Sequence, residues 1–276
     1  MNKLELFDNI KKKKSFLCVG LDTDITKIPK HLLQLTDPVF EFNKQIIDAT
    51  IEYAVAYKPN TAFYECLGTK GWESLEKTIQ YLNQIKDRPF VIADAKRGDI
   101  GNTSTMYAKA FFEQMNVDAI TVSPYMGSDS VKPFLTFKDK WAIILALTSN
   151  EGASDFQYSS SEIKTQLFET ILEKGKKWGN ENNMMWVVGA TKAEMLKTIR
   201  NIVPNHFLLI PGIGNQGGNL REVVKNGLNK QCGLIVNASR SIIYAGNKND
   251  FAQKSTNEAK KVQKEMEQLL YQYNLL

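Results

Sequence analysis

Eight short apolar runs, rich in β-branched residues, recur along the chain and constrain its fold more than any other feature. They cover residues 16–22, 53–59, 89–94, 117–123, 141–147, 184–190, 206–211 and 232–238. Runs that are apolar nearly throughout, rather than alternating with polar residues, are typical of strands buried on both faces of a parallel sheet. The sequence therefore predicts eight parallel strands.

Most of the gaps between these runs carry apolar residues at helical spacing. The clearest is 38–52, where Asp37 is a capping residue and Pro38 stands in the first turn. The others are 72–86, 104–115, 161–178, 191–201 and 251–273. The link after the fourth run, PYMGSDSVKPF, is weaker and predicts only a short helix.

The alternation of strands and helices predicts an α/β fold. No Pro-, Gly- or Ser-rich linker interrupts the 276 residues, so we expect a single domain over 1–276. The length and the count of eight favour a (β/α)₈ TIM barrel. An open doubly wound sheet is the alternative architecture.

Cysteine and histidine are too sparse for several kinds of chemistry. The three cysteines, Cys18, Cys66 and Cys232, are too scattered for a disulfide framework or a zinc site, which favours a reducing compartment. Of the two histidines, His206 enters an apolar run and His31 stands in a polar segment, so both are expected to be structural. Acid–base chemistry then falls to carboxylates and lysines.

The ends of the chain and its charge bear on location and partners. Residues 1–14 lack the apolar segment of a signal peptide, and no run of about 18 apolar residues predicts a membrane span. We therefore expect a cytoplasmic protein without a membrane partner. The net charge of +5 is densest at Lys11–Lys14, where no aromatic residue is interleaved, so a solvated helix end is favoured over a nucleic-acid site.

Polar residues gather where the predicted strands end. In a (β/α)₈ barrel the active site forms at the carboxyl ends of the strands. The residues at these ends are Asp22, Lys58, Asp94, Lys96, Thr148, Ser149, the segment 211–218 and Asn237 to Arg240. The strand bodies hold almost no ionisable groups. This contrast indicates a functional site.

The segment DAKRGDIGNT, residues 94–103, is the densest of these ends. If strand geometry persists, Asp94 and Lys96 point to the same side, and Gly98 permits a turn that moves Asp99 toward or away from them. With Lys58 and Asp22 from neighbouring strands, two cations alternate with three carboxylates. The carboxylates would keep the lysines protonated, so that Lys96 serves as a general acid. An ordinary salt-bridge network at the barrel mouth explains the spacing equally well.

The segment PGIGNQGG, residues 211–218, matches the dinucleotide pattern G-x-G-x-x-G only weakly, because it lies late in the chain and lacks the acidic partner. After a seventh barrel strand, glycine amides typically bind a phosphate group, to which Arg240 would add a bidentate contact. A plain glycine-rich turn is the alternative. The polar segment 148–161 fits either a mobile lid or an ordinary surface loop.

With these residues in place, the chain resembles the orotidine 5′-phosphate decarboxylase family, specifically its longer bacterial, type 2 group. The resemblance covers roughly residues 14–246. It rests on LCVGLD, YKPN, DAKRGDIGNT, PYMGSD, TSNEGA, PGIGNQGG and NASRSIIYA, in that order. Thr23 and Ser123 depart from the residues usual in this group, proline and asparagine. Both lie outside the proposed proton-transfer set.

The resemblance implies a carboxy-lyase that converts orotidine 5′-monophosphate to UMP and CO₂, the last step of de novo pyrimidine biosynthesis, without a metal or organic cofactor. It implies a catalytic set, a set of substrate-binding residues, and a homodimer in which Asp99 and Thr103 reach the partner's site. The catalytic set is Lys96, Asp94, Lys58 and Asp99, with Lys96 protonating carbon 6. The substrate-binding residues are Asp22, Thr103, Ser149, Gln216, Arg240 and Gly214.

Three other functions remain as alternatives. A sugar-phosphate decarboxylase of the same superfamily would need magnesium, which Lys58 at the end of the second strand would repel. An aldolase-type barrel would use Lys58 or Lys96 as a Schiff-base nucleophile. A basic RNA-binding protein would show salt-dependent affinity and no turnover.

Overall fold

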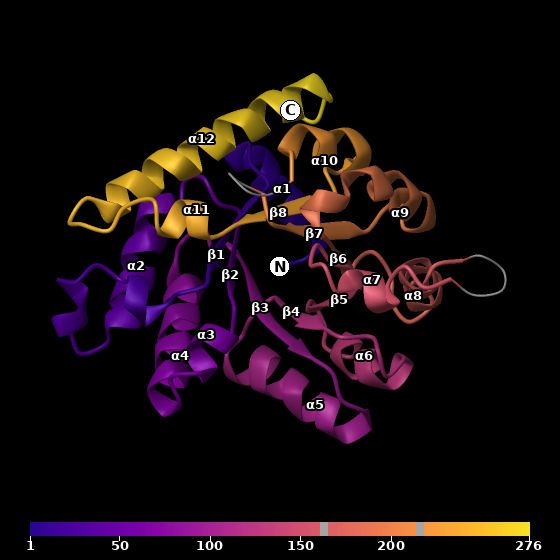
Figure 1. Ribbon diagram of the computed structural model, residues 1–276, viewed down its shortest axis with the longest axis horizontal. Coiled ribbons are helices and arrows are strands. Elements are labelled where there is room, and N and C mark those ends of the chain that lie inside the picture. Colours follow the sequence, from indigo (N-terminus) through magenta and orange to yellow (C-terminus); the bar gives the residue numbers. More distant parts are fainter. Residues whose placement is uncertain (161–164, 214–217) are drawn as a thin grey trace.

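The computed structural model describes residues 1–160, 165–213 and 218–276, which form a closed barrel of parallel strands (Figure 1). The strands are Leu17–Leu21 (β1), Ala56–Pro59 (β2), Phe90–Arg97 (β3), Ala119–Val122 (β4), Trp141–Leu147 (β5), Met184–Val188 (β6), Phe207–Pro211 (β7) and Leu234–Ala238 (β8). Each strand pairs with the next, and β8 pairs with β1, which closes the sheet. All eight predicted strands and the barrel architecture are confirmed.

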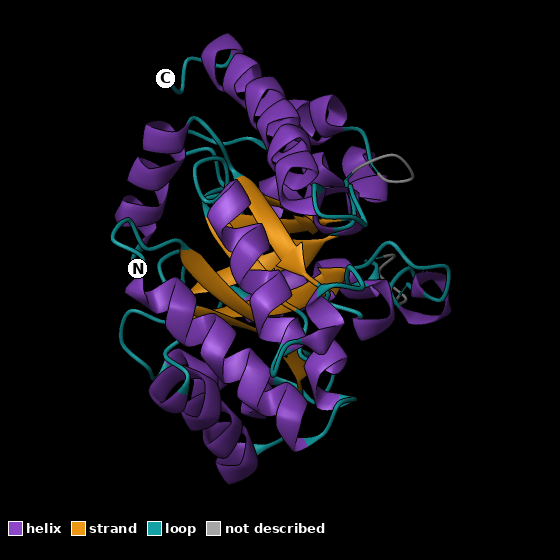
Figure 2. Ribbon diagram, turned by 90° about the vertical axis from the view of Figure 1, so that its left-hand side faces the viewer, coloured by secondary structure: helices purple, strands orange, loops and turns teal. Residues whose placement is uncertain are grey.

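The helices pack around the outside of the strands (Figure 2). They are Lys3–Lys13 (α1), Pro38–Thr50 (α2), Ala62–Glu65 (α3), Thr69–Gln84 (α4), Gly101–Lys109 (α5), Ser128–Leu135 (α6), Ala153–Phe156 (α7), Leu167–Gly175 (α8), Leu196–Ile202 (α9), Leu220–Gly227 (α10), Arg240–Ile243 (α11) and Phe251–Gln272 (α12). Shorter turns are Ile25–Lys27 (η1), Leu32–Gln34 (η2), the π-helical Ala110–Gln114 (η3) and Ala190–Met195 (η4).

The helices predicted over 38–52, 72–86 and 251–273 differ from α2, α4 and α12 only at their ends. The helix predicted over 104–115 ends in the π-helical η3, and the one predicted over 191–201 begins as the 3-10 helix η4, which breaks at Lys192 before α9. The helix expected over 161–178 is α8, which begins later because the Gln166 backbone N–H donates to the Glu169 side chain in a capping box. Residues 161–164 lie outside the described residues. The short helix expected after the fourth strand is α6.

Helix α2 illustrates how the outer layer is held. The Asp37 side chain accepts the Phe40 backbone N–H and caps the helix, as its sequence predicts. The helix turns Phe42 and Ile46 inward, where both are fully buried, and Phe42 stacks on Phe251 of α12 at 5.3 Å. Each such buried side chain contributes about 1.5–3 kcal/mol to folding. Sequence-distant helices are joined in this way into one shell around the barrel.

Two of the cysteines and His206 are buried, as the apolar runs that contain them predict. Cys18 and Cys232 are fully buried, and burial raises the pKa of each thiol to about 12. His206 is buried just before β7, and burial lowers the pKa of its imidazole to about 4. Within the described ranges, no helix combines the length and apolar character needed to cross a membrane.

Candidate active site

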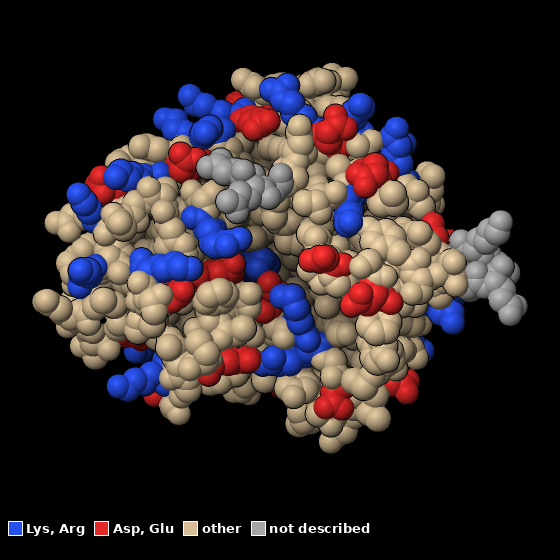
Figure 3. Space-filling model, in the orientation of Figure 1, with Lys and Arg blue, Asp and Glu red and all other residues tan. Residues whose placement is uncertain are grey.

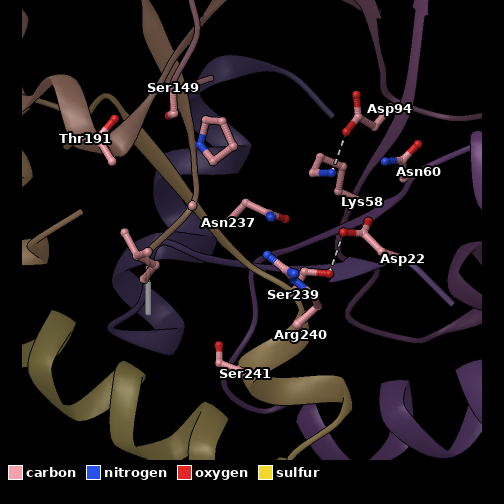
Figure 4. A pocket seen from close by; sticks show the side chains of 13 residues that line it. Asp22, Lys58, Asn60, Asp94, Ser149, Thr191, Asn237, Ser239, Arg240 and Ser241 are labelled. Atoms are coloured by element: carbon pink, nitrogen blue, oxygen red, sulfur yellow. Dashed lines mark hydrogen bonds and ion pairs between the residues drawn. The ribbon is translucent and has the colours of Figure 1, made fainter. Parts of the chain in front are cut away.

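A cavity of about 680 Å³ opens at the carboxyl ends of the strands, a volume typical of small-molecule sites, which span about 300–1,000 Å³. Figure 3 shows a hollow in the middle of this face with acidic and basic side chains around it. The cavity is lined by Asp22, Lys58, Asn60, Asp94, Ser149, Thr191, Pro211, Gly212, Ile213, Asn237, Ser239, Arg240 and Ser241 (Figure 4). Residues at or just beyond the ends of seven strands, all except β4, therefore converge on one space.

Asp94 is the centre of the charged end of this cavity. Its Oδ2 accepts a hydrogen bond from Lys58 Nζ at 2.7 Å, and its Oδ1 accepts one from Lys96 Nζ at 2.6 Å. The Thr121 hydroxyl donates to the same Oδ1 at 3.0 Å. One carboxylate thus holds two ammonium groups, each on a different oxygen.

The two lysines differ in how far their side chains are buried. The Lys58 side chain is 4% exposed, whereas that of Lys96 is 51% exposed. Burial alone would lower the pKa of Lys58, but the carboxylates of Asp94 and Asp22 outweigh it and hold that pKa above its ordinary value. Burial likewise opposes ionisation of Asp94, yet Lys58 and Lys96 keep its pKa well below the usual range. The Lys58–Asp94 pair is therefore fully charged at neutral pH.

The contact predicted between Asp94 and Lys96 is present, but regular strand geometry does not produce it. Lys96 has a φ of +47°, in the left-handed region, and the register of β3 against β4 shifts between Ala93 and Arg97. A left-handed non-glycine residue is uncommon and often lies at a functional site. Here the bulge brings the Lys96 ammonium back onto Asp94.

Asp22, at the end of β1, forms a hydrogen bond with Ser239, the residue that follows β8. The Ser239 hydroxyl donates to Asp22 Oδ2 at 2.8 Å and lies 3.0 Å from the Gly20 carbonyl oxygen. Gly20 makes this approach possible, because a Cβ there would lie 2.8 Å from the Ser239 Cβ and 3.0 Å from Asn237 Oδ1. Asp22 Oδ1 and Asn237 Oδ1 are both buried and lack partners among the described residues. Both are acceptors open to a ligand's donors.

Figure 4 shows Arg240 and Ser241 at the end of the cavity away from Asp94. Gly212 and Ile213 line the same cavity, and Arg240 is exposed to it. This arrangement provides a cation some distance from the Lys58–Asp94 pair, as the sequence led us to expect for a phosphate end. Gly214 and Gln216, also predicted there, lie outside the described residues.

Three further predicted residues divide into two groups. Ser149 follows β5 and lines the cavity. Asp99 and Thr103 are not among the described residues that line it. Asp99 instead accepts the Ile100 backbone N–H, and Thr103 is exposed on α5. Within one chain, the structure therefore brings Asp22, Lys58, Asp94, Ser149 and Arg240 to the cavity lining. Lys96 is not among the described lining residues and is joined to the cavity through Asp94, whereas Asp99 and Thr103 make no hydrogen bond or ion pair to the lining residues within the described part of the chain.

Several residues that the structure brings to the site have no role in the sequence-based prediction. Asn60 and Thr191 line the cavity, and the buried Thr121 donates a hydrogen bond to Asp94. Asn60 directly follows β2, two residues after Lys58, so its position at a strand end is a usable signal. Thr121 is a polar residue inside an apolar run, which is a usable signal, but only the pairing of β3 with β4 places it beside Asp94.

Comparison with known proteins gives a consistent answer. The family model described as Orotidine 5′-phosphate decarboxylase / HUMPS family matches residues 15–255. An orotidine 5′-phosphate decarboxylase of Phocaeicola vulgatus is 60% identical over 272 residues, covering 99% of this chain and 100% of the relative. One of Flavobacterium johnsoniae is 60% identical over 270 residues, covering 98% of each chain.

The chain belongs to the orotidine 5′-phosphate decarboxylase family. Solved structures agree with this assignment. A putative orotidine-monophosphate decarboxylase of Toxoplasma gondii superposes with a TM-score of 0.85 at 30% identity, covering 98% of this chain and 97% of the other. The Leishmania donovani OMP decarboxylase has a TM-score of 0.79 at 35% identity, with coverage of 95% and 99%. The resemblance seen in the sequence, and with it the prediction of a carboxy-lyase, is confirmed.

A magnesium-dependent sugar-phosphate decarboxylase is the alternative that the sequence left open. Within residues 1–160, 165–213 and 218–276, no three His, Cys, Asp or Glu side chains cluster as a metal site would require. The end of β2 contributes the Lys58 ammonium to this cavity, paired with Asp94. The donor set of this cavity therefore suits an anionic ligand better than a divalent cation.

Proposed function

We propose that this single-domain barrel, residues 1–276, decarboxylates orotidine 5′-monophosphate to UMP and CO₂. This reaction would be the last step of de novo pyrimidine biosynthesis in the cytoplasm. The observation that carries the proposal is the cavity with Asp94 clamped between Lys58 and Lys96 at one end and Arg240 at the other. A nucleotide with a carboxylate on its base and a phosphate on its ribose matches these two charged ends.

Lys96 is the proposed acid. The bond between carbon 6 of the pyrimidine and the carboxylate carbon breaks, CO₂ departs, and the electron pair stays on carbon 6. The Lys96 ammonium then gives its proton to carbon 6, and the neutral amine regains a proton from water. A vinyl carbanion has little resonance stabilisation, so a fixed adjacent ammonium is an effective stabiliser of the charge that develops.

Lys58 and Asp94 would maintain the charge pattern around that acid. Asp94 would lie against the substrate carboxylate, and its two lysine contacts support an ionised state throughout. Lys58 is buried and protonated, so it would act through its fixed charge and by binding a ribose hydroxyl rather than by transferring a proton. Lys96 is the more exposed of the two lysines, which supports its role as the group that exchanges protons with water.

The remaining cavity residues would bind the rest of the nucleotide. Asp22 Oδ1, which has no partner among the described residues, would accept a hydrogen bond from a ribose hydroxyl. Ser149 would contact the pyrimidine ring. Arg240, with Gln216 and the amide of Gly214, would hold the phosphate. Binding of the remote phosphate would supply energy to order the surrounding loops.

We also propose a homodimer with shared active sites. Asp99 and Thr103 are not among the described residues that line their own cavity, and large apolar side chains are exposed beside them in the sequence: Ile100 at 55% and Met106 at 49%. Tyr125, which is 87% exposed before α6, extends this surface, because α5 and α6 pack together through Ser104 and Ser130. A second copy on this face would cover the apolar side chains and receive Asp99 and Thr103 in its own cavity.

The decisive assay is the loss of orotidine 5′-monophosphate ultraviolet absorbance when the purified protein is added in EDTA. Turnover that is insensitive to EDTA is expected, since the proposal requires no metal or organic cofactor. Turnover of a sugar phosphate that EDTA abolishes would instead favour the magnesium-dependent relatives. Absence of any turnover would refute the proposed function.

The role of Lys96 is tested by Lys96→Ala, with Lys197→Ala as a control at an exposed lysine outside the cavity. We expect Lys96→Ala to lose at least about 10²–10⁴-fold in kcat, the range of general acid catalysis, while it still binds UMP. The control should retain full activity. A Lys96→Ala variant with normal turnover would contradict the assignment.

The shared site is tested by mixing two inactive variants. Lys96→Ala and Asp99→Ala homodimers each lack one essential group at both sites. After dissociation and reassociation, a heterodimer has one site with both groups intact, so mixing should restore about a quarter of wild-type activity. Mixtures that stay inactive, while wild-type protein treated identically recovers, would exclude a site shared through Asp99.

A further inference from the structure

Strand β3 makes an unusual excursion next to the proposed acid. Ala93 pairs with Ile120 of β4, and Arg97 pairs with Val122. Residues 94–96 therefore lie opposite Thr121 alone. A regular ladder between two parallel strands would place one residue opposite one, so at this point the backbone of β4 does not supply the usual ladder of partners.

The Thr121 side chain takes over this role. Its Oγ1 accepts the Lys96 backbone N–H at 2.9 Å and donates to Asp94 Oδ1 at 3.0 Å. Thr121 is 1% exposed, so water does not compete for either bond. The Lys96 ammonium returns to the same Asp94 Oδ1 at 2.6 Å. These contacts close a ring from the Lys96 main chain through Thr121 and Asp94 to the Lys96 side chain.

The ring accounts for the left-handed backbone of Lys96. A non-glycine residue at a φ of +47° needs compensation from its surroundings, and a hydrogen bond to its N–H provides it. The Thr121 hydroxyl also helps to fix the rotation of the Asp94 carboxylate. Oδ1 of Asp94 accepts hydrogen bonds from Thr121 and Lys96, while Oδ2 accepts one from Lys58. Main chain and ammonium of Lys96 are thus positioned by a single buried hydroxyl.

We propose that Thr121 is a positioning residue for Lys96, whose hydroxyl holds the acid at the bulge of β3 and aims its ammonium into the site. This inference rests on the proposed function. Thr121 is 1% exposed, whereas the Lys96 side chain is 51% exposed, so Thr121 would act through Lys96 and Asp94 rather than by contact with substrate. Its removal should therefore change kcat and leave nucleotide binding nearly intact.

The test compares Thr121→Val, which keeps the shape and removes the hydroxyl, with Thr121→Ser, which retains it. Thr50→Val is the matched control: Thr50 is fully buried and its hydroxyl also has two partners, Ile46 O and Tyr57 Oη, but it lies on α2 outside the barrel. A hydrogen bond to a charged group predicts a loss of roughly 10- to 100-fold in kcat for Thr121→Val. KM should stay within about threefold.

The outcomes separate positioning from a purely structural role. Positioning predicts that Thr121→Ser recovers most of kcat, and that Thr50→Val loses stability comparably to Thr121→Val but keeps its kcat. Thr121→Val with kcat within about twofold of wild type would overturn the inference, as would a serine variant as slow as the valine variant. An equal loss of kcat in Thr50→Val would do the same.

A second measurement is independent of turnover. Hydrogen exchange of the Lys96 backbone amide should accelerate at least about tenfold in Thr121→Val but not in Thr121→Ser, while the amide of Ile92 on the same strand is unchanged. Unchanged exchange at Lys96 would overturn the inference even in an active enzyme. If wild-type protein fails to decarboxylate the nucleotide, the proposed function falls, and the exchange data still decide whether Thr121 holds Lys96.

Discussion

Lys58 and Lys96 bind the same carboxylate, yet their replacement by methionine should have opposite consequences. Lys58 Nζ lies 2.7 Å from Asp94 with both side chains buried, and at an effective dielectric of about 20 their attraction is about 6 kcal/mol. Methionine recovers the cost of burying the ammonium but leaves a buried carboxylate whose Oδ2 has lost its cation, while Lys96 and Thr121 still donate to Oδ1. Breaking a buried pair in this way typically costs 3–5 kcal/mol, about the loss we expect for Lys58→Met.

Lys96→Met removes an ammonium whose side chain is 51% exposed. Solvent screens such a pair, so the expected loss of stability is at most about 1 kcal/mol, although turnover should be abolished. Stability and activity should therefore separate: one lysine holds the site together, and the other performs the proposed chemistry.

The assay is urea-induced unfolding at pH 7.5, followed by circular dichroism at one fixed protein concentration, because the stability of the proposed dimer would depend on concentration. The control is Lys58→Met combined with Asp94→Leu, which removes both charges and should recover part of the loss. The reasoning is refuted if Lys58→Met unfolds within about 1 kcal/mol of wild type, or if Lys96→Met is the less stable of the two variants.

Two further predictions concern groups outside the proton-transfer set. The folded-state pKa of His206, about 4, lies below the unfolded value of 6.5, so the unfolded chain binds more protons between these values and stability falls as pH falls below about 6.5. Wild type should lose about 2 kcal/mol from this group between pH 7.5 and pH 5, and His206→Phe should not; equal acid sensitivity of the two proteins in urea unfolding would exclude His206 as the cause. Gly20→Ala should force Ser239 away from Asp22, lower the unfolding free energy by about 1–3 kcal/mol and raise KM; a normal KM would show that the Ser239–Asp22 contact does not matter for binding.

Most of the fold could be predicted from local patterns. Strands that are buried on both faces are apolar nearly throughout, so the eight strands can be recognised as apolar runs. The spacing between these runs leaves room for one covering helix each. Helix ends were less accurate, as at α8, because a capping box rather than apolar spacing decides where the helix begins. The sequence also placed Asp22, Lys58, Asp94, Ser149 and Arg240 at strand ends, and strand ends meet at one face of any such barrel.

The amino-acid sequence alone thus identifies the residues that gather at the carboxyl end of the barrel. It does not distinguish a salt-bridge network from a catalytic centre in DAKRGDIGNT, since the spacing is the same in both. The three-dimensional arrangement of the segment comes from long-range strand pairing. Pairing of β3 with β4 creates the bulge, sets Lys96 in a left-handed conformation and brings the Thr121 hydroxyl between its main chain and Asp94. Burial then distinguishes two lysines that look equivalent in the sequence, because Lys58 is enclosed by the barrel while Lys96 reaches solvent.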